Sequence, residues 1–324
     1  MNELILQQPG RFVIRDGPEP RAGDGDALVR VHRVGICGSD VHAFRGTMPF
    51  VQCPRILGHE LGVEVQTAPP NERGIRAGDR CAVEPYLACG TCHACGLDRP
   101  NCCESLRVLG IHMDGGMRPL FSVPVSCLHA SRKLSVDQLA LIETLGIGAH
   151  AVARSGLAEG ERALVVGVGA IGLTTLQFAM AQGAAVTALE INDRRRAFVA
   201  SRFGVEALAE PDGRDYDVVF DATGNVQAME ASFEHVAAGG RLVFVGLIND
   251  RISFSDPLLH RKEITILASR NSKHQFPRII GLVEDGTIDT APWITHRLAF
   301  TQVPERFTDV VQSPELVKAI IEVA

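Results

Sequence analysis

Four cysteines lie close together in the segment CGTCHACGLDRPNCC and carry the clearest chemical signal of the chain. Two residues separate the first from the second and the second from the third, and seven separate the third from the fourth: Cys89, Cys92, Cys95 and Cys103. Thiolates at such spacings can converge on one tetrahedral ion, and zinc favours four sulfur ligands in a closed structural site. A disulfide-rich loop is the alternative, which the two-residue spacings disfavour. The segment therefore predicts a structural zinc site.

A second set of potential metal ligands is spread over three short motifs. Cys37 lies in GICGSDVH, His59 and Glu60 lie in GHE, and Glu143 lies in LIETLG. Each residue is ambiguous alone, because a single His or Glu is more often only a polar or solvated side chain. Together, a thiolate, an imidazole and a carboxylate leave one open position on a zinc ion, as a catalytic site requires. Whether Glu60 or Glu143 is the direct ligand stays open.

A glycine motif, GVGAIG, follows a buried strand candidate at 162–166 and opens a helical pattern at 173–182. In this context the GxGxxG spacing is typical of dinucleotide binding rather than of an ordinary turn. Gly167 permits the tight turn, Gly169 lets the backbone approach a pyrophosphate, and Gly172 lets the helix pack on the strand. The helix N-terminus favours phosphate charge, and Ile171 in the same turn is assigned to the cofactor site.

Glu190 ends the next strand candidate, 185–190, about twenty positions after the glycine motif. A carboxylate there can accept hydrogen bonds from both ribose hydroxyls and would repel a 2′-phosphate, which favours NAD over NADP. Arg194, Arg195 and Arg196 follow closely and weaken this preference, because a nearby arginine can bind a 2′-phosphate. We assign Arg195 to the cofactor site.

The elements that must position these residues change character along the chain. Residues 1 to about 145 contain short β-type runs, such as 27–34, 62–66 and 80–83, and indicate a compact, barrel-like β domain. A helical stretch at 141–156 follows. Helix patterns at 193–203 and 227–237 then alternate with strand candidates, which predicts a doubly wound parallel sheet; the candidates lie at 162–166, 185–190, 217–221, 241–245 and 263–267. The tail after about 270 is expected to fold back onto the first domain.

Composition limits the class of protein. The chain has 324 residues, 46% of them hydrophobic, and a net charge of −6. This length suggests two domains, and the absence of a basic block argues against nucleic acid as a partner. No signal peptide and no apolar run of about 18 residues is visible, so we expect no membrane association. Nine cysteines, an odd number, fit a reducing cytoplasm.

Taken together, the motifs GICGSDVH, GHE, AGDR, the four-cysteine segment and GVGAIG resemble the zinc-dependent medium-chain dehydrogenases, which include alcohol and sorbitol dehydrogenases. The resemblance covers nearly the whole chain. It implies a GroES-like β-barrel catalytic domain, 1–145 plus 271–324, and a Rossmann NAD-binding domain, 146–270. It also implies two zinc ions per chain, NAD as cofactor, a small-molecule substrate and a homodimer or homotetramer.

The resemblance also implies roles for single residues. Cys37, His59 and Glu143 match catalytic-zinc ligands, and Glu60 matches a residue that is in the family either a direct ligand or a neighbour of the ligands. Asp40 resembles the carboxylate that orients the ligand histidine. Ser39 resembles the hydroxyl that takes the substrate proton, and His42 the end of the relay to solvent. The family pattern also favours Cys103 over the adjacent Cys102 as the fourth structural ligand.

Glu143, where alcohol dehydrogenases have cysteine, indicates the polyol and sorbitol branch. Within it, the segments 54–60, 108–116, 254–257 and 268–271 are similar to bacterial L-galactonate and L-gulonate dehydrogenases and to starvation-sensing proteins. Arg270 matches a substrate-adjacent arginine, and a guanidinium suits a sugar carboxylate; contact with cofactor or backbone only is the alternative. The function this implies is hydride transfer from a secondary alcohol of a polyol or sugar acid to NAD⁺. Threonine or simple alcohol dehydrogenase activity, or a regulatory protein that binds NAD(H) without turnover, are the alternatives.

The chain departs from the family pattern at two places. Val63 stands where glycine is usual, with Gly62 just before it, and we expect a local shift of a strand there. The link 207–216 is too short for the usual crossover helix, which needs about 10 residues or more. A loop and a shortened sheet edge are therefore predicted.

Overall fold

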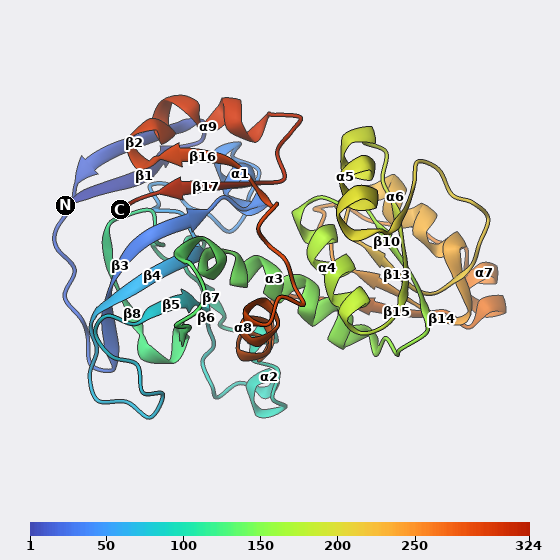
Figure 1. The fold of residues 1–324 in the computed structure, drawn as a ribbon, viewed down its shortest axis with the longest axis horizontal. Helices are drawn as coiled ribbons and strands as arrows, with labels where there is room; N and C mark the ends of the chain where they lie inside the picture. The colour runs from blue at the N-terminus through green and yellow to red at the C-terminus, as the bar shows by residue number, and fades with distance from the viewer. The chain divides into compact units, whose positions relative to one another are not determined.

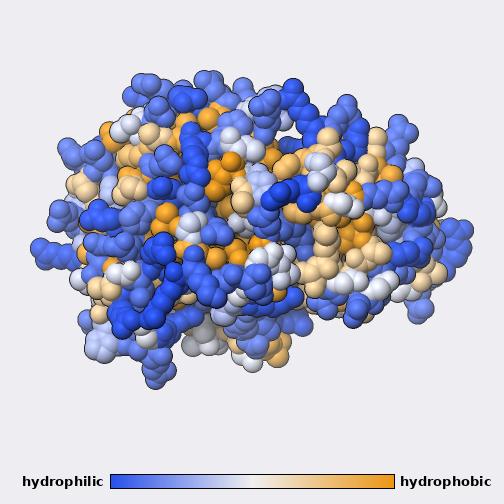
Figure 2. Space-filling view, viewed as in Figure 1, coloured by the Kyte–Doolittle hydropathy of each residue, from blue (hydrophilic) through white to orange (hydrophobic).

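The computed structural model describes residues 1–324, which form two compact units. The first unit consists of Met1–Glu143 and Phe276–Ala324, and the second of Thr144–Gln275. Hydrophilic residues dominate the surface seen in Figure 2, where apolar residues gather in smaller patches. No helix combines the length and the apolar character that crossing a bilayer requires.

The first unit is built on a seven-stranded sheet around β3 (Asp26–Gly35), in the order β16-β17-β3-β4-β5-β9, with β8 also paired to β3. Alternate residues of β3 are buried, including Val29 and Val31, as the sequence pattern predicted. The C-terminal strands, red in Figure 1, lie beside β3, in blue. The other strands are β4 (Glu60–Thr67), β5 (Arg80–Val83), β8 (Leu120–Pro124), β9 (Leu128–Ala130), β16 (Ile294–Ala299) and β17 (Lys318–Glu322).

Two small sheets and several helices complete this unit. In α9 (Val303–Val311), Phe307 packs on Phe12 of β2 and Phe44 of α1 with ring centroids 5.0 and 4.9 Å apart, so the C-terminal tail packs on the N-terminal part of the chain. The two-stranded sheets pair β1 (Asn2–Gln8) with β2 (Arg11–Asp16) and β6 (Tyr86–Leu87) with β7 (Arg107–Val108). The helices are α1 (Gly38–Phe44), α2 (His93–Gly96), the first part of α3 (Val136–Ser155), α8 (Phe276–Glu284) and α9 (Val303–Val311).

The second unit is a six-stranded parallel sheet in the order β12-β11-β10-β13-β14-β15. The order reverses beside β10, because the chain continues first toward β12 and then, on the other side, toward β15; helices α4 and α7 lie on opposite sides of the sheet in Figure 1. Leu164, Val219 and Leu242 are buried in its core. The strands are β10 (Arg162–Val166), β11 (Ala185–Leu189), β12 (Glu206–Leu208), β13 (Tyr216–Asp221), β14 (Val236–Phe244) and β15 (Thr265–Ala268), and the helices are α4 (Ala170–Ala181), α5 (Asp193–Phe203), α6 (Val226–Ala231) and α7 (Asp256–Lys262).

The largest differences from the predicted element boundaries are at the start of α3 and at the junction of α6 with β14. The helix expected at 141–156 is α3, which begins five residues earlier, at Val136. The helix expected at 227–237 ends at Ala231 and is followed by a 3₁₀ turn, Ser232–His235, after which β14 begins. Gly239, with φ +74°, lies within β14. Because glycine is unfavourable inside a strand, the sequence pattern did not predict that β14 begins before this residue.

The link between β12 and β13 contains no helix, as predicted from its length. The sheet edge is correspondingly short, because β12 has only three residues. Arg214 in this link pairs with Glu206 and Asp212 and so ties the loop to the edge strand. A small cavity of about 270 Å³ remains beside the link, lined in part by Thr187 and Tyr216.

The second departure, Gly62-Val63, coincides with an irregularity in the sheet. Val31 pairs with Val63 but Arg33 pairs with Gly62, so the shift in register falls on His32 of β3. A Cβ atom on Gly62 would lie 2.1 Å from the carbonyl oxygen of Val136, which explains the glycine at this position. The strand shift expected here is therefore a bulge in the partner strand.

Candidate active site

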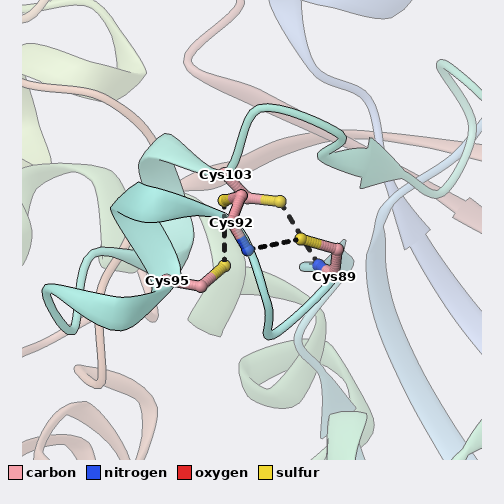
Figure 3. A group of neighbouring side chains, drawn as sticks. All are labelled: Cys89, Cys92, Cys95 and Cys103. Carbon is pink, nitrogen blue, oxygen red and sulfur yellow. Dashed lines mark hydrogen bonds between the residues drawn. The ribbon is translucent and has the colours of Figure 1, made fainter.

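The structure brings the four cysteines of residues 89–103, the four-cysteine lobe, to a common centre (Figure 3). The four sulfur atoms lie within 4.8 Å of one another. Helix α2 and the 3₁₀ turn Pro100–Cys102 fold the segment back on itself, which leaves Cys102 exposed and Cys103 buried beside Leu106 and Val108. None of the nine cysteines forms a disulfide, so the alternative of a disulfide-rich loop is wrong.

Hydrogen bonds within the lobe favour thiolates. The backbone and side chain of Thr91, and the backbone N–H of Cys92, donate to Cys89 Sγ and lower the pKa of that thiol to about 6. The N–H of Cys89 in turn donates to Cys103 Sγ at 3.2 Å. In contrast, desolvation and the neighbouring Cys92 raise the pKa of Cys95 to about 12. Four thiolates this close need a compensating cation, and four sulfur donors are the set that structural zinc takes.

The second group of ligand atoms starts at helix α1. Strand β3 ends at Gly35, and Cys37 is the N-cap of α1. The N–H of Cys37 donates to Asp40 Oδ2 at 2.9 Å, so the buried Asp40 caps the helix and fixes Cys37 at its start. Ser39 lies in the first turn, next to Asp40.

Cys37, His59 and Glu60 form a compact set, which we call the Cys37 group. One ligand atom of each lies within 4.8 Å of the others. His59 and Glu60 are only 4% and 1% exposed, whereas Cys37 is partly exposed, so the group is open to solvent on the cysteine side alone. Ser39 Oγ lies 3.4 Å from His59 Nε2. Asp40 Oδ1 is 4.0 Å from His59 Nδ1, which is an ion-pair distance but too long for a hydrogen bond.

Glu60 is held by a residue that sequence reasoning missed. Lys318 Nζ, from β17, donates to Glu60 Oε1 at 2.5 Å, and Lys318 is buried. Glu60 Oε2 lies against β3, where a Cβ atom on Gly35 would be 2.0 Å away. A signal was present in the sequence, because Lys318 is the charged residue of the apolar run VKAII, and a buried charge requires a partner.

Glu143 lies on α3, outside the 4.8 Å set of the Cys37 group. The hydroxyl of Tyr86, from β6, donates to Glu143 Oε1. Nothing around Tyr86 in the sequence indicated this contact. The structure thus favours Glu60 as the carboxylate nearest to Cys37 and His59, with Glu143 held by Tyr86.

The charges around the Cys37 group fit a cation. Burial lowers the pKa of His59, but Cys37 and Asp40 outweigh it and hold this pKa well above its ordinary value. Burial raises the pKa of Glu143, and Glu60 adds to the effect. His59 Nδ1 and Glu60 Oε2 are buried without any hydrogen-bond partner. Sulfur, nitrogen and carboxylate donors, two of them with an unfilled hydrogen-bonding position, are the donor set that a catalytic zinc ion takes.

In the second unit, a cavity of about 560 Å³ lies at the carboxyl ends of β10, β11 and β13, where the strand order reverses. Such a switch point is the usual ligand site of an open parallel sheet. Gly167, with φ +80°, and Gly169, the N-cap of α4, both line it. A Cβ atom on Gly172 would lie 1.8 Å from the carbonyl oxygen of Gly167, so that glycine permits the close packing of helix and turn.

Glu190 lines this cavity and is almost fully buried. Its two carboxylate oxygens accept the N–H groups of Val168 and Asn192, each at 2.9 Å. Arg195 also lines the cavity, with Nη1 3.8 Å from Glu190 Oε2. Ile171 and Gly172 do not line it, and the carbonyl of Ile171 accepts the hydroxyls of Thr174 and Thr175 instead. A cofactor contact of Ile171 stays a prediction.

Two further predicted residues lie at the surface. His42 is exposed on α1, three residues after Ser39, with Nδ1 3.0 Å from Thr47 Oγ1. Arg270 is exposed two residues after the end of β15, in the second unit. Their roles as proton relay and substrate contact stay predictions.

Comparison with known proteins identifies the family. The family model described as alcohol dehydrogenase GroES-like domain matches residues 23–133, and that described as zinc-binding dehydrogenase matches residues 170–285. An L-galactonate-5-dehydrogenase from Escherichia coli (strain K12) is 40% identical, over 99% of this chain and 98% of its own length. The chain therefore belongs to the zinc-dependent medium-chain dehydrogenases.

Two solved structures extend the similarity. A zinc-binding dehydrogenase from Sinorhizobium meliloti 1021 bound to NADP has a TM-score of 0.91 and 28% identity, covering 99% of both chains. The alcohol dehydrogenase RspB from Escherichia coli CFT073, complexed with NADH, has a TM-score of 0.92 and 26% identity, covering 100% of this chain and 99% of its own. The predicted fold class, a GroES-like β domain with a Rossmann sheet, is confirmed, as is a zinc-dependent dehydrogenase of the alcohol and polyol class.

Proposed function

We propose that this enzyme oxidises a secondary hydroxyl of a sugar acid, a hexonate such as L-galactonate or L-gulonate, with transfer of a hydride to NAD⁺. The observation that carries the proposal is the Cys37 group beside Ser39, in a chain 40% identical to a relative named for L-galactonate. The donor set supports the dehydrogenase chemistry, and the relative supports the substrate class.

We infer that Cys37 and His59, with Glu60 or Glu143, hold the catalytic zinc, and the structure favours Glu60. Zinc there supplies Lewis acidity that lowers the pKa of a substrate hydroxyl. Lys318 fixes one oxygen of Glu60, and Tyr86 fixes one oxygen of Glu143, so both carboxylates are oriented by a buried donor. Asp40 keeps Cys37 at the start of α1 and adds negative charge beside His59.

The proton of the substrate hydroxyl is proposed to pass to Ser39 and then toward solvent through His42. Ser39 Oγ lies 3.4 Å from His59 Nε2, so this hydroxyl is adjacent to the proposed ligand set. His42 is exposed and shares the helix with Ser39 at a spacing of three residues, which puts both side chains on one face of α1.

NAD⁺ is the proposed cofactor, with Gly167 and Gly169 at the pyrophosphate and Glu190 at the adenosine ribose. Two backbone N–H groups donate to the Glu190 side chain and fix its orientation at the cavity, where its oxygens can accept ribose hydroxyls. The four-cysteine lobe is proposed to hold the second, structural zinc on Cys89, Cys92, Cys95 and Cys103, because four sulfur ligands leave no open position.

The substrate assignment rests on Arg270 together with the relative. A guanidinium binds a carboxylate through two parallel hydrogen bonds, which a neutral polyol cannot offer. If Arg270 reads the carboxylate, Arg270→Lys should raise the KM for hexonates while leaving that for sorbitol within about twofold. An equal rise for both substrates would contradict the assignment.

The direct test is NAD⁺ reduction by the purified, zinc-containing protein with L-galactonate, L-gulonate, sorbitol, threonine and a short alcohol side by side. We expect the highest kcat/KM with a hexonate, and zinc near two ions per chain on the same sample. Preference for threonine or a simple alcohol would contradict the substrate class. Binding of NAD⁺ without turnover of any panel member would indicate a regulatory protein.

We also propose that the enzyme is a homodimer or homotetramer. Strand β15 is an unpaired edge of the six-stranded sheet, and Ile266 on it is 39% exposed. Open edges of native sheets are usually covered or paired, and a second copy would cover this one. Light scattering should give two or four times the 34.9 kDa of one chain, and a mass of one chain would contradict the proposal.

A further inference from the structure

The cofactor cavity of the second unit contains a second acidic side chain besides Glu190. Its ionisable lining residues are Glu190, Arg195, Glu210 and His235. Glu210 belongs to the short link between β12 and β13, the segment where the family's crossover helix is missing. The first residues of this link line the cavity.

The backbone places Glu210 beside Glu190. The N–H of Glu190 donates to the carbonyl of Leu208 at 2.9 Å, which joins the ends of β11 and β12. Glu210 follows only two residues after Leu208, and Ala209, Glu210 and Pro211 all line the cavity. A residue before proline is restricted to extended conformations, and proline fixes its own φ. The position of Glu210 at this end of the cavity is therefore narrowly determined.

The charges do not cancel at this end of the cavity. Arg195 is the one cation among the lining residues, and it already lies 3.8 Å from Glu190. Burial lowers the pKa of His235, so its ring is neutral at pH 7. Glu210 is exposed and makes neither an ion pair nor a hydrogen bond. Two carboxylates against one guanidinium leave a net negative charge, which repels an added phosphate but hardly affects a ribose hydroxyl.

We propose that Glu210 is a second specificity residue for the dinucleotide, which acts with Glu190 to exclude a 2′-phosphate despite the nearby Arg195. The inference rests on the proposed use of NAD⁺ and extends it to a residue outside the glycine motif and the β11 terminus. Glu190 favours NAD⁺ by accepting hydrogen bonds from the ribose hydroxyls, whereas Glu210 disfavours NADP⁺ only through its negative charge.

Titration of the zinc-containing protein with NAD⁺ and NADP⁺, followed by calorimetry, tests this without any need for turnover. Glu210→Gln should tighten NADP⁺ binding about fivefold and change the NAD⁺ affinity by less than about twofold, since only the phosphate meets the removed charge. Asp309→Asn removes one exposed carboxylate from α9 in the first unit and is the matched control, which should change neither affinity. Glu190→Gln, in contrast to Glu210→Gln, should weaken NAD⁺ binding, because it replaces one hydrogen-bond-accepting oxygen by an NH₂ group.

Salt provides a second readout. An exposed charge is screened by salt, and the Debye length falls from about 20 Å at 20 mM NaCl to about 4 Å at 500 mM. In the wild type, the ratio of NADP⁺ to NAD⁺ affinity should therefore rise over this range, and it should rise less in Glu210→Gln. An NADP⁺ to NAD⁺ ratio in Glu210→Gln within twofold of the wild type would overturn the role of Glu210 while NAD⁺ preference itself stands. A wild-type protein that prefers NADP⁺, or binds neither dinucleotide, would overturn the proposed cofactor and the inference together.

Discussion

The four-cysteine lobe and the Cys37 group both bring thiols and a proposed zinc ion together, but they are built in opposite ways. All ligands of the lobe come from residues 89–103, and its own core is small, with Cys103, Leu106 and Val108 as its buried residues. The Cys37 group takes Cys37 from the start of α1 and Glu60 from β4, and its supporting Lys318 comes from β17.

The difference separates what each ion is needed for. A loop with little core depends on its metal for order, as small zinc-binding segments do. The Cys37 group instead lies on strands of a large sheet with an extensive apolar core, so its geometry exists before any ion binds. We therefore expect removal of the zinc ion from the four-cysteine lobe to lower stability, and removal of the zinc ion from the Cys37 group to lower activity.

The largest expected effect is on catalysis, in Cys37→Ser. Loss of the thiolate should reduce kcat/KM by about 10³-fold or more, because a Lewis acid supplies several kcal/mol of transition-state stabilisation. The unfolding temperature should change little, since the strands keep their core. Cys53→Ser, a change at a partly buried cysteine outside both groups, is the control. If Cys37→Ser kept a tenth of wild-type activity, the zinc mechanism would be wrong.

Lys318→Met should have the next largest effect. It leaves the buried Glu60 without its ion-pair partner, and breaking a buried pair in this way costs about 3–5 kcal/mol. Urea unfolding of the zinc-containing protein measures the loss. The double variant Lys318→Met/Glu60→Gln should recover part of this stability but not the activity. Equal stability of the single and double variants would show that the pair is not coupled.

Cys103→Ser reverses the pattern expected of Cys37→Ser. We expect one zinc ion fewer per chain, an unfolding temperature lower by roughly 5–10 °C, and kcat/KM per folded molecule within about threefold of the wild type. Cys102→Ser changes the adjacent, exposed cysteine and should leave zinc content and stability unchanged. If the two variants behaved alike, the assignment of the fourth ligand would fail.

The four-cysteine lobe could be predicted from the sequence more fully than the Cys37 group. The reason is the distance along the chain between the residues that meet. The convergence of the four sulfur atoms of the lobe could be predicted from their close spacing along the chain, with the family pattern choosing Cys103 over Cys102. Cys37, His59 and Glu60 could be proposed only as a set, since their meeting depends on how β3 and β4 pair. Lys318 lies 258 residues from Glu60 along the chain, and Tyr86 approaches Glu143 through a two-stranded sheet that no periodicity reveals.

In the second unit, too, elements that follow each other directly in the sequence could be predicted, whereas arrangements of distant segments could not. Strand, turn and helix around Gly167 follow each other directly and could be predicted with nearly correct boundaries. The start of β14 could not, because Gly239 interrupts its pattern. The absence of a crossover helix between β12 and β13 could be predicted from the length of the link alone. The position of this link beside the cofactor cavity could not, because it depends on the order of the strands in the sheet.

Tyr86→Phe should have the smallest effect. It tests whether the Tyr86 hydroxyl stabilises the charged form of Glu143 near the Cys37 group. The lost hydroxyl leaves a buried carboxylate without its donor, which costs about 1–3 kcal/mol. Burial already raises the pKa of Glu143, whereas the Tyr86 hydrogen bond lowers it, so the variant raises it further. A raised pKa in the folded state means that stability is lost as pH rises, so the deficit of Tyr86→Phe should be larger at pH 8 than at pH 5.

Urea unfolding of zinc-containing wild type and variant at the two pH values measures this difference. A deficit that does not change with pH would mean that Tyr86 supports Glu143 only by packing. A larger deficit at pH 8, with zinc content unchanged, would mean that the hydroxyl stabilises the charged carboxylate. The negative charge of Glu143 near the Cys37 group would then depend on Tyr86, a residue distant in sequence. The four-cysteine lobe needs no such distant residue, because all its ligands lie within residues 89–103.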